Sequence, residues 1–281
     1  MIVNTELEHK GNLFPSKIID FKKDVDKLYF STDNDVILEL TVVRDSVLRF
    51  RYTTVGNFNN DFSYAITKYA SIGYNKLEIE EKESSYEVLT SKLRCEISKE
   101  TLKISIYDAV DGTLINQDEN GFHWEESYEF GGNIVKMSKI SNDGESYYGL
   151  GDKPNHLNLK GKRYTNWVTD SYAYGKDTDP IYKTIPFYTG LHHGKAYGIF
   201  FDNTFQSSFD FSYERRNVTS FWAQGGEMNY YFFYGPKMGD VVESYTDLTG
   251  KPHHLPPLWA LGFHQCKWSY YPESKVKEIT S

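Results

Sequence analysis

The sequence predicts a mainly β protein, in which a large antiparallel β-sandwich is followed by the start of a second domain of another type. From about residue 27 onward, apolar residues alternate with polar ones, and turn residues separate the short runs. Many short strands with hardly a helical period among them are typical of a sandwich. Residues 255–271 instead have the pattern of a buried strand, and the opening of a helix follows up to Ser281. Because a strand that leads into a crossover helix begins a parallel α/β domain, we expect the front part of a larger protein.

The alternation is clearest in residues 47–52, which we predict to be a half-buried antiparallel strand. The three apolar residues at 48, 50 and 52 fall on one face, whereas Arg49 and Arg51 fall on the other. Further candidate strands are residues 93–97, 102–106, 196–201, 206–211 and 228–234. The pairs Asp111-Gly112 and Asp143-Gly144 suit the positive φ angles of tight hairpin turns.

A convincing helix precedes the predicted domain boundary. In residues 240–249 the apolar side chains Val241, Tyr245 and Leu248 share one face, and Gly250 follows the last turn. Three prolines then lie within residues 251–257, which indicates a stiff connector. The predicted division is a sandwich domain over residues 1–247, a proline-rich connector over 248–257 and the start of the second domain over 258–281.

Composition argues against several classes of partner. The net charge is -8 and the pI is about 5.5, with Lys and Arg scattered among acids, so we expect no nucleic acid and no membrane surface as partner. No apolar run suggests a secretion signal or a membrane span, which predicts a cytoplasmic protein. Cys95 and Cys266 lie far apart and are expected to be small buried residues, with no disulfide framework and no metal cluster.

Candidate binding chemistry is concentrated in residues 148–188, a polar and aromatic segment that departs from the alternation and is predicted to be a long loop. Trp167 and Asp170 lie close together in it, and Asp177 and Asp179 add two further acids. An aromatic face that stacks on a sugar ring, with carboxylates for its hydroxyls, is typical of a saccharide site. The alternative is structural: Trp167 anchors the loop, and the three acids cap or close turns.

Other motifs predict neither a metal site nor a cofactor site. The histidine pairs at 192–193 and 253–254 are expected to point their side chains apart at the surface, which is a poor chelating geometry. Gly149-Leu-Gly151 lacks the third glycine and the flanking βα unit of a dinucleotide-binding loop, so we interpret it as a turn.

Four segments, taken in order, resemble glycoside hydrolase family 31, the α-glucosidase and α-xylosidase group. They are Tyr148-Gly-Leu-Gly-Asp152, Trp167-Val-Thr-Asp170 with Asp179-Pro-Ile-Tyr-Lys-Thr-Ile-Pro-Phe-Tyr188, Gly225-Gly-Glu-Met-Asn-Tyr-Tyr-Phe-Phe-Tyr-Gly235, and residues 255–268. The matching segments lie between residues 148 and 281, and residues 1–147 add no motif of their own.

The resemblance implies a galactose-mutarotase-like β-sandwich that leads into a (β/α)8 barrel, of which the chain holds the first strand and the start of the first helix. It also implies retaining hydrolysis of terminal α-linked sugars by two Asp residues about 5 Å apart. Both are expected beyond Ser281, so no catalytic residue is assigned. Asp170 matches an acid that the sandwich loop brings to the substrate, and Trp268 matches an aromatic position of the sugar pocket. Trp167, with the two later acids, is a further candidate on the same loop.

The expected function is the N-terminal part of an α-glucosidase-like hydrolase, inactive by itself. Its expected partners are an α-linked oligosaccharide or α-glucoside and the C-terminal barrel of the same protein, and no cofactor is expected. Two alternatives remain: a non-catalytic carbohydrate-binding module, and a structural domain whose aromatic loop only packs against the barrel. The choice among glucosidase, xylosidase, transglycosylase and lyase depends mostly on barrel residues.

Overall fold

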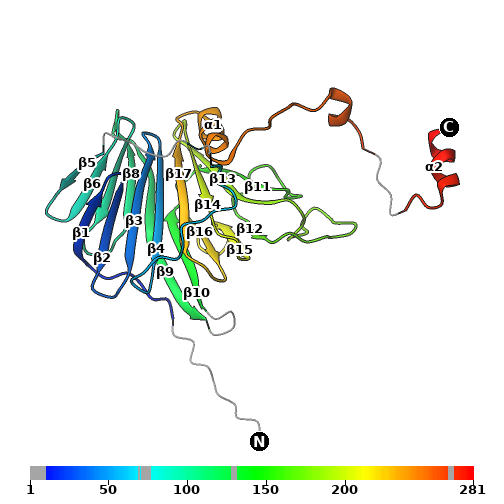
Figure 1. Ribbon diagram of the computed structural model, residues 1–281. Helices are drawn as coiled ribbons and strands as arrows, with labels where there is room; N and C mark the ends of the chain where they lie inside the picture. The colour runs from blue at the N-terminus through cyan, green and yellow to red at the C-terminus, as the bar shows by residue number, and fades with distance from the viewer. Residues whose placement is uncertain (1–10, 69, 71–76, 128–131, 265–268) are drawn as a thin grey trace, which may run out of the picture. The chain divides into compact units, whose positions relative to one another are not determined.

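The computed structural model describes residues 11–68, 70, 77–127, 132–264 and 269–281. The chain forms two compact units, Met1–Gly250 and Lys251–Ser281. The first unit is a sandwich of two antiparallel sheets, whose strands run side by side in Figure 1. This confirms the mainly β class predicted from the alternation, while the exact domain limits stay a prediction.

One sheet has eight strands, and each neighbouring pair is antiparallel. In spatial order they are β1 (Ile18–Asp24), β2 (Lys27–Thr32), β3 (Ile37–Arg44), β4 (Val47–Thr53), β17 (Met228–Tyr234), β14 (Lys195–Phe201), β13 (Thr184–His192) and β11 (Ser146–Gly151). The first four strands are therefore joined through β17 to strands from the far end of the sandwich sequence.

The other sheet has nine strands, again antiparallel throughout. In spatial order they are β12 (Arg163–Asn166), β15 (Ser207–Phe211), β16 (Val218–Ala223), β10 (Gly132–Ile140), β9 (Leu114–Ser127), β8 (Ile104–Asp108), β7 (Leu93–Ser98), β6 (Ser85–Leu89) and β5 (Glu78–Glu81). β11 and β12 thus lie at an edge of each sheet, which places the segment between them at one end of the sandwich.

The main core lies between the two sheets and is rich in aromatic rings. Phe50 of β4 stacks on Tyr230 of β17 with centroids 5.0 Å apart, and Tyr52 of β4 stacks on Phe122 of the opposite sheet at 4.5 Å. Such pairs add specific contacts to the area that the rings bury. The face predicted to be apolar in residues 47–52 therefore is a core face.

The other face of β4 is buried as well, so the prediction of a half-buried strand is wrong. Arg49 donates to both carboxylate oxygens of Asp61, at 2.7 and 2.9 Å, and Arg51 pairs with Glu227 at 2.5 Å. A buried guanidinium is tolerated when its donors are paired in this way. Alternation of Arg with apolar residues indicated a water-exposed face here, but these acids cover it instead.

Helix α1 (Met238–Thr249) covers the outer face of the eight-stranded sheet beside β13, β14 and β17 (Figure 1). Val241 and Leu248 are buried in a second apolar cluster, and Tyr245 stacks on Phe187 with centroids 4.0 Å apart. The predicted helix is confirmed, although it begins two residues earlier than expected, at Met238 instead of residue 240.

The two predicted hairpin turns differ in role. Gly112, at φ 74°, lies between β8 and β9, which are antiparallel neighbours, so this hairpin is confirmed. Gly144, at φ 76°, lies between β10 and β11, which belong to different sheets. The second prediction is therefore wrong, because a turn with the same local chemistry here connects the two layers.

The predictions for cysteine and histidine are confirmed in part. Cys95 is fully buried in β7, whereas Cys266 lies outside the described residues. The pair at 253–254 is exposed, as expected. His192 is not a surface residue, because it is buried and its Nε2 lies 2.7 Å from the carbonyl oxygen of Ile115. The reason is register, since it shares the inward face of β13 with two buried residues at 188 and 190. The prediction that the side chains of this pair point apart is also wrong, since Nδ1 of His192 lies 2.9 Å from Nδ1 of His193.

The second unit contains a 3-10 helix, η1 (Leu258–Leu261), and helix α2 (Glu273–Thr280). Within residues 258–264 the predicted buried strand is absent, and Trp259 is 79% exposed. A barrel strand needs neighbouring strands for its backbone hydrogen bonds, and residues 258–264 pair with no strand of the described chain. Residues 265–268, with Trp268, lie outside the described residues. In the described chain, no helix has the length and apolar character needed to span a membrane.

Candidate functional site

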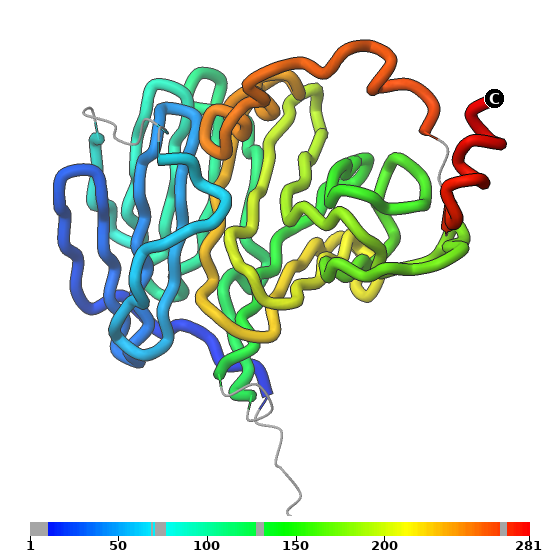
Figure 2. The backbone as a smooth tube through the Cα atoms, turned by 45° about the vertical axis from the view of Figure 1, so that its right-hand side comes forward, coloured from blue at the N-terminus to red at the C-terminus, as the bar shows by residue number. Residues whose placement is uncertain are grey.

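The predicted long loop of residues 148–188 is divided by strands. β12 pairs with β15, so the irregular parts are residues 152–162 and 167–183. Figure 2 shows this green part of the chain projecting from the sandwich. We call residues 167–183 the edge loop, because it leads from β12 at the edge of one sheet to β13, the neighbour of edge strand β11 in the other.

Gly149-Leu-Gly151 lies within β11 and is not the turn that we predicted. Gly149 and Gly151 have φ angles of 132° and 78°. A Cβ at Gly151 would lie 2.0 Å from the carbonyl oxygen of Lys183, and one at Gly149 would lie 2.5 Å from that of Phe187. Only glycine allows the backbones to approach so closely. The motif therefore fixes where the edge loop joins β13.

Trp167 and Asp170 lie on the exposed part of the edge loop. Trp167 is 51% exposed, and Val168 and Tyr172 are exposed further. Asp170 is exposed and makes no hydrogen bond or ion pair with any residue in the described part of the chain. A free carboxylate near an exposed indole can accept hydrogen bonds from ligand hydroxyls.

The other two acids of the edge loop are engaged within the protein. Asp179 accepts a hydrogen bond from Nζ of Lys153 at 2.8 Å and another from the backbone N–H of Thr165. Asp177 lies 3.4 Å from Nζ of Lys162 in an exposed ion pair. Asp179 holds the loop closed at its base and Asp177 makes only an exposed contact, so both have the role that the structural alternative describes. Among the three predicted acids, that role does not apply to Asp170.

A hollow of about 350 Å³ lies beside Trp167. Its lining residues are Asn166, Trp167, Val168, Thr184, Pro186, Asn203, Thr204, Phe205 and Ser207. The lining carries aromatic rings, hydroxyls and amides and no ionisable side chain. Such a lining suits a neutral ligand with hydroxyl groups, such as a sugar ring.

Phe205 provides the second aromatic surface of this hollow and is 46% exposed. Cβ atoms placed on Gly225 and Gly226 would lie 2.7 and 3.1 Å from its ring, so the ring packs directly on this glycine pair. Asn203 donates to the carbonyl oxygen of Gly225 at 2.9 Å and accepts the N–H of Phe205 at 2.8 Å. The ring is therefore held in place.

Asn166 lines the same hollow at the end of β12 and is 5% exposed. Neither its amide nitrogen nor its amide oxygen has a partner among the described residues. A buried polar group without a partner costs roughly 1–3 kcal/mol. Both amide atoms are closed to solvent in this structure, so a ligand in the hollow would reach them only after the lining moves.

The sequence prediction missed Asn166 and Phe205. Nothing in the local pattern distinguishes Phe205 from the many other aromatic residues of the chain. The adjacent glycines at 225–226 are a usable signal, because paired glycines beside a strand indicate close approach of another group. Which ring approaches them depends on the tertiary fold. The role predicted for Trp268 stays a prediction, because that residue lies outside the described ones.

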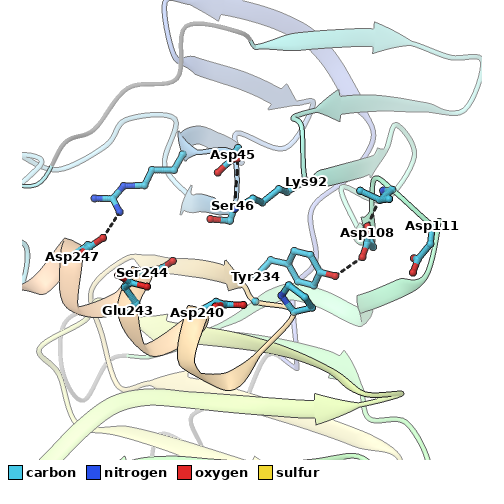
Figure 3. A pocket seen from close by; sticks show the side chains of 14 residues that line it. Asp45, Ser46, Lys92, Asp108, Asp111, Tyr234, Asp240, Glu243, Ser244 and Asp247 are labelled. Atoms are coloured by element: carbon cyan, nitrogen blue, oxygen red, sulfur yellow. Dashed lines mark hydrogen bonds and ion pairs between the residues drawn. The ribbon is translucent and has the colours of Figure 1, made fainter.

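A larger hollow, of about 680 Å³, is lined by acids from α1 and from the turns near β4 and β8 (Figure 3). Its acids are largely neutralised by neighbours. Asp108 accepts hydrogen bonds from Tyr234 and Lys195, and Asp247 pairs with Arg44 at 2.9 Å. No group of side chains with metal-binding geometry occurs among the described residues. We therefore place the candidate site at the edge loop.

Comparison with known proteins identifies the family. Residues 37–210, from β3 to β15, match the glycosyl hydrolase 31 N-terminal galactose mutarotase-like domain. The chain belongs to this family. The resemblance inferred from the four segments is thereby confirmed, and the β-sandwich is the family's N-terminal domain.

Glycosyl hydrolase 31 relatives extend well beyond the region that this chain matches. Alpha-glucosidase 2 of Bacillus thermoamyloliquefaciens is 33% identical over 246 residues, which is 86% of this chain and 30% of the relative. The alpha-glucosidase of Saccharolobus solfataricus is 38% identical over 148 residues, or 53% of this chain and 21% of the relative. This chain therefore spans less than a third of either relative.

A solved structure likewise matches nearly all of this chain but less than a third of its own length. A dextranase of this family from Flavobacterium johnsoniae, complexed with isomaltotriose, is 32% identical with a TM-score of 0.84, over 95% of this chain and 32% of that one. An alpha-xylosidase of this family from a soil metagenome, at 20% identity and a TM-score of 0.74, shares the fold.

Proposed function

We propose that this chain is the N-terminal part of a retaining α-glucosidase-like hydrolase that cleaves terminal α-linked sugars, and that its edge loop contributes to the substrate site. The observation that carries the proposal is the state of Asp170, which is exposed and has no partner in the described part of the chain, on a loop that Asp179 holds closed. Family membership and the carbohydrate ligand of the dextranase support the ligand class.

In this proposal the chemistry belongs to a (β/α)8 barrel whose first strand and helix begin within residues 258–281. Retaining hydrolysis uses one carboxylate as nucleophile and one as acid/base, about 5 Å apart, and needs no cofactor. We assign neither role to a residue of this chain. By itself the chain is expected to be inactive, and a cytoplasmic location remains part of the proposal.

The role proposed for Asp170 is to accept hydrogen bonds from substrate hydroxyls near the cleaved bond. A hydrogen bond to a charged group contributes roughly 1.5–3 kcal/mol, which corresponds to about 10- to 150-fold in binding. Trp167 and Trp268 would offer ring faces to the sugar. When the substrate binds at the barrel mouth, these groups would restrict its orientation relative to the catalytic pair.

The test is Asp170→Asn in the complete hydrolase, assayed on an α-glucoside. The expected result is a fall in kcat/KM of at least tenfold with unchanged thermal stability. The matched control is Asp143→Asn, an exposed acid in the turn between β10 and β11, which should leave activity unchanged. Equal activity of Asp170→Asn and the parent would contradict the proposal and favour the purely structural alternative.

A non-catalytic carbohydrate-binding module is the second candidate function. The hollow with Phe205 and an uncharged lining favours it. Calorimetric titration of this chain with isomaltotriose tests it directly. Saturable binding that Phe205→Ala abolishes, and that Tyr213→Ala on another exposed aromatic residue preserves, would support the module. No heat at millimolar sugar would exclude it.

A further inference from the structure

The edge loop leaves the sandwich and returns to it at nearly the same point, which we call the neck. The loop begins after Asn166, the last residue of β12, so Thr165 lies just before it, and Asp179 lies on its returning part. The backbone N–H of Thr165 donates to one carboxylate oxygen of Asp179. Nζ of Lys153 donates to the carbonyl oxygen of Thr165 at 2.7 Å and to the other oxygen of Asp179 at 2.8 Å. Lys153, Thr165 and Asp179 thus form a closed set of hydrogen bonds.

The side chains of Lys153 and Asp179 in the neck are buried, whereas most of residues 167–177 are exposed. The side chain of Lys153 is 2% exposed, and that of Asp179 is 18% exposed. Burial lowers the pKa of Lys153 below its ordinary value, and the bond to Asp179 opposes that effect. A buried ammonium with a paired carboxylate and a carbonyl oxygen is stable only in a narrow geometry. The pair therefore fixes the separation of the two ends of the loop.

Asp170 lies between those two ends and has no anchor of its own in the described part of the chain. The next residue, Ser171, donates its hydroxyl to the carbonyl oxygen of Pro180 at 3.1 Å, so the position of Asp170 depends on how firmly the returning end beside Asp179 is held. Closing a flexible segment at its base removes most of the conformations that it can adopt. An exposed ion pair further along the loop adds little stability to the closed loop. The Lys162–Asp177 pair is of that exposed kind.

We propose that Lys153 and Asp179 are positioning residues, which hold the edge loop so that Asp170 meets the substrate. Neither residue touches the sugar; both act through Asp170. This inference rests on the proposed function for its catalytic readout, but its structural part concerns this chain alone. Two experiments therefore separate the two claims.

The first experiment is hydrogen exchange on this chain with Lys153→Met, followed by mass spectrometry of peptides. Exchange in residues 167–178 should become at least tenfold faster, while peptides of β4 and β17 keep their protection. The matched control, Lys162→Met, removes the cation of the exposed pair and should leave loop exchange unchanged. If Lys153→Met unfolds the sandwich, Asp179→Asn replaces it. Unchanged loop exchange in a folded variant would overturn the inference.

The second experiment is a double-mutant cycle on kcat/KM in the complete hydrolase. Lys153→Met should lower kcat/KM about tenfold in the parent and have no further effect once Asp170 is Asn, because its influence passes through that carboxylate. Equal, additive losses in both backgrounds would overturn the positioning role. If Asp170→Asn alone leaves kcat/KM unchanged, that result contradicts the proposed function instead. The failure of the inference and the failure of the proposed function are therefore distinguishable.

Discussion

Replacing Asp118 with Asn should strongly destabilise the sandwich. Nζ of Lys139 lies 2.7 Å from Oδ1 of Asp118, with side-chain exposures of 2% and 0%. The other oxygen of Asp118 accepts the N–H of Ile104 at 2.9 Å, and Oη of Tyr230 lies 3.5 Å from Nζ of Lys139. Asn keeps the shape of the side chain but leaves the buried ammonium without a counter-charge.

The magnitude follows from the burial. Breaking a buried ion pair by removing one partner costs roughly 3–5 kcal/mol, since the remaining charge cannot reach water. For a domain of this size, each kcal/mol lowers the melting temperature by about 2–4 °C. The expected decrease therefore lies between about 6 and 20 °C.

Urea unfolding followed by tryptophan fluorescence measures this free energy. Asp118→Asn should move the midpoint to lower urea with little change in slope. The double variant Asp118→Leu with Lys139→Met removes both charges and should return to within about 1–2 kcal/mol of the parent. A loss below about 1 kcal/mol in Asp118→Asn, or a double variant as unstable as the single one, would refute the reasoning.

Two further predictions concern pH and association. The hydrogen bond from Arg49 lowers the pKa of Asp61 to about 2 from 3.8, so the stabilisation is complete above about pH 4 and is lost as the pH falls toward 2. The pKa shift of 3.8 − 2 = 1.8 corresponds to at most about 2.4 kcal/mol of stability, and the 43% exposure of the Asp61 side chain reduces it to roughly 1 kcal/mol. In urea unfolding, Asp61→Asn should therefore lack this loss of stability at acid pH. The exposed apolar residues Trp259 and Phe263 should make the chain associate at high concentration, and Trp259→Ser should weaken that association in light scattering. A parent chain that stays monomeric at every concentration would count against the second prediction.

Sequence patterns predicted the sandwich because its strands alternate and its helix α1 carries a regular apolar face. They failed where tertiary contacts decide the outcome. The buried arginines of β4 look like surface residues until the acids that cover them are known, namely Asp61 for Arg49 and Glu227 for Arg51. The turn at Gly144 has hairpin chemistry, but its strands pair with other partners.

The candidate site was predictable to a similar extent. The composition of the edge loop indicated a saccharide site, and the motif with Trp167 and Asp170 located its exposed part. Residue spacing alone did not separate Asp170 from the two structural acids; only the resemblance to the family did. What separates them is Lys153, which reaches Asp179 across 26 positions. The strand expected within residues 255–271 depends on neighbouring strands of a barrel, and the local sequence pattern does not supply those strands.

The order of strands in the eight-stranded sheet has a consequence for synthesis on the ribosome. β4 ends at Thr53, but its neighbour β17 begins at Met228, so the hydrogen-bonding edge of β4 stays open until most of the chain has been made. Strands so far apart in sequence pair slowly, because the entropy of closing a long loop is lost before any favourable contact forms. During that interval β1 to β4 form an incomplete sheet with an apolar face. β17 is thus the last strand of the sandwich to emerge, and it joins β1–β4 to the rest of the eight-stranded sheet.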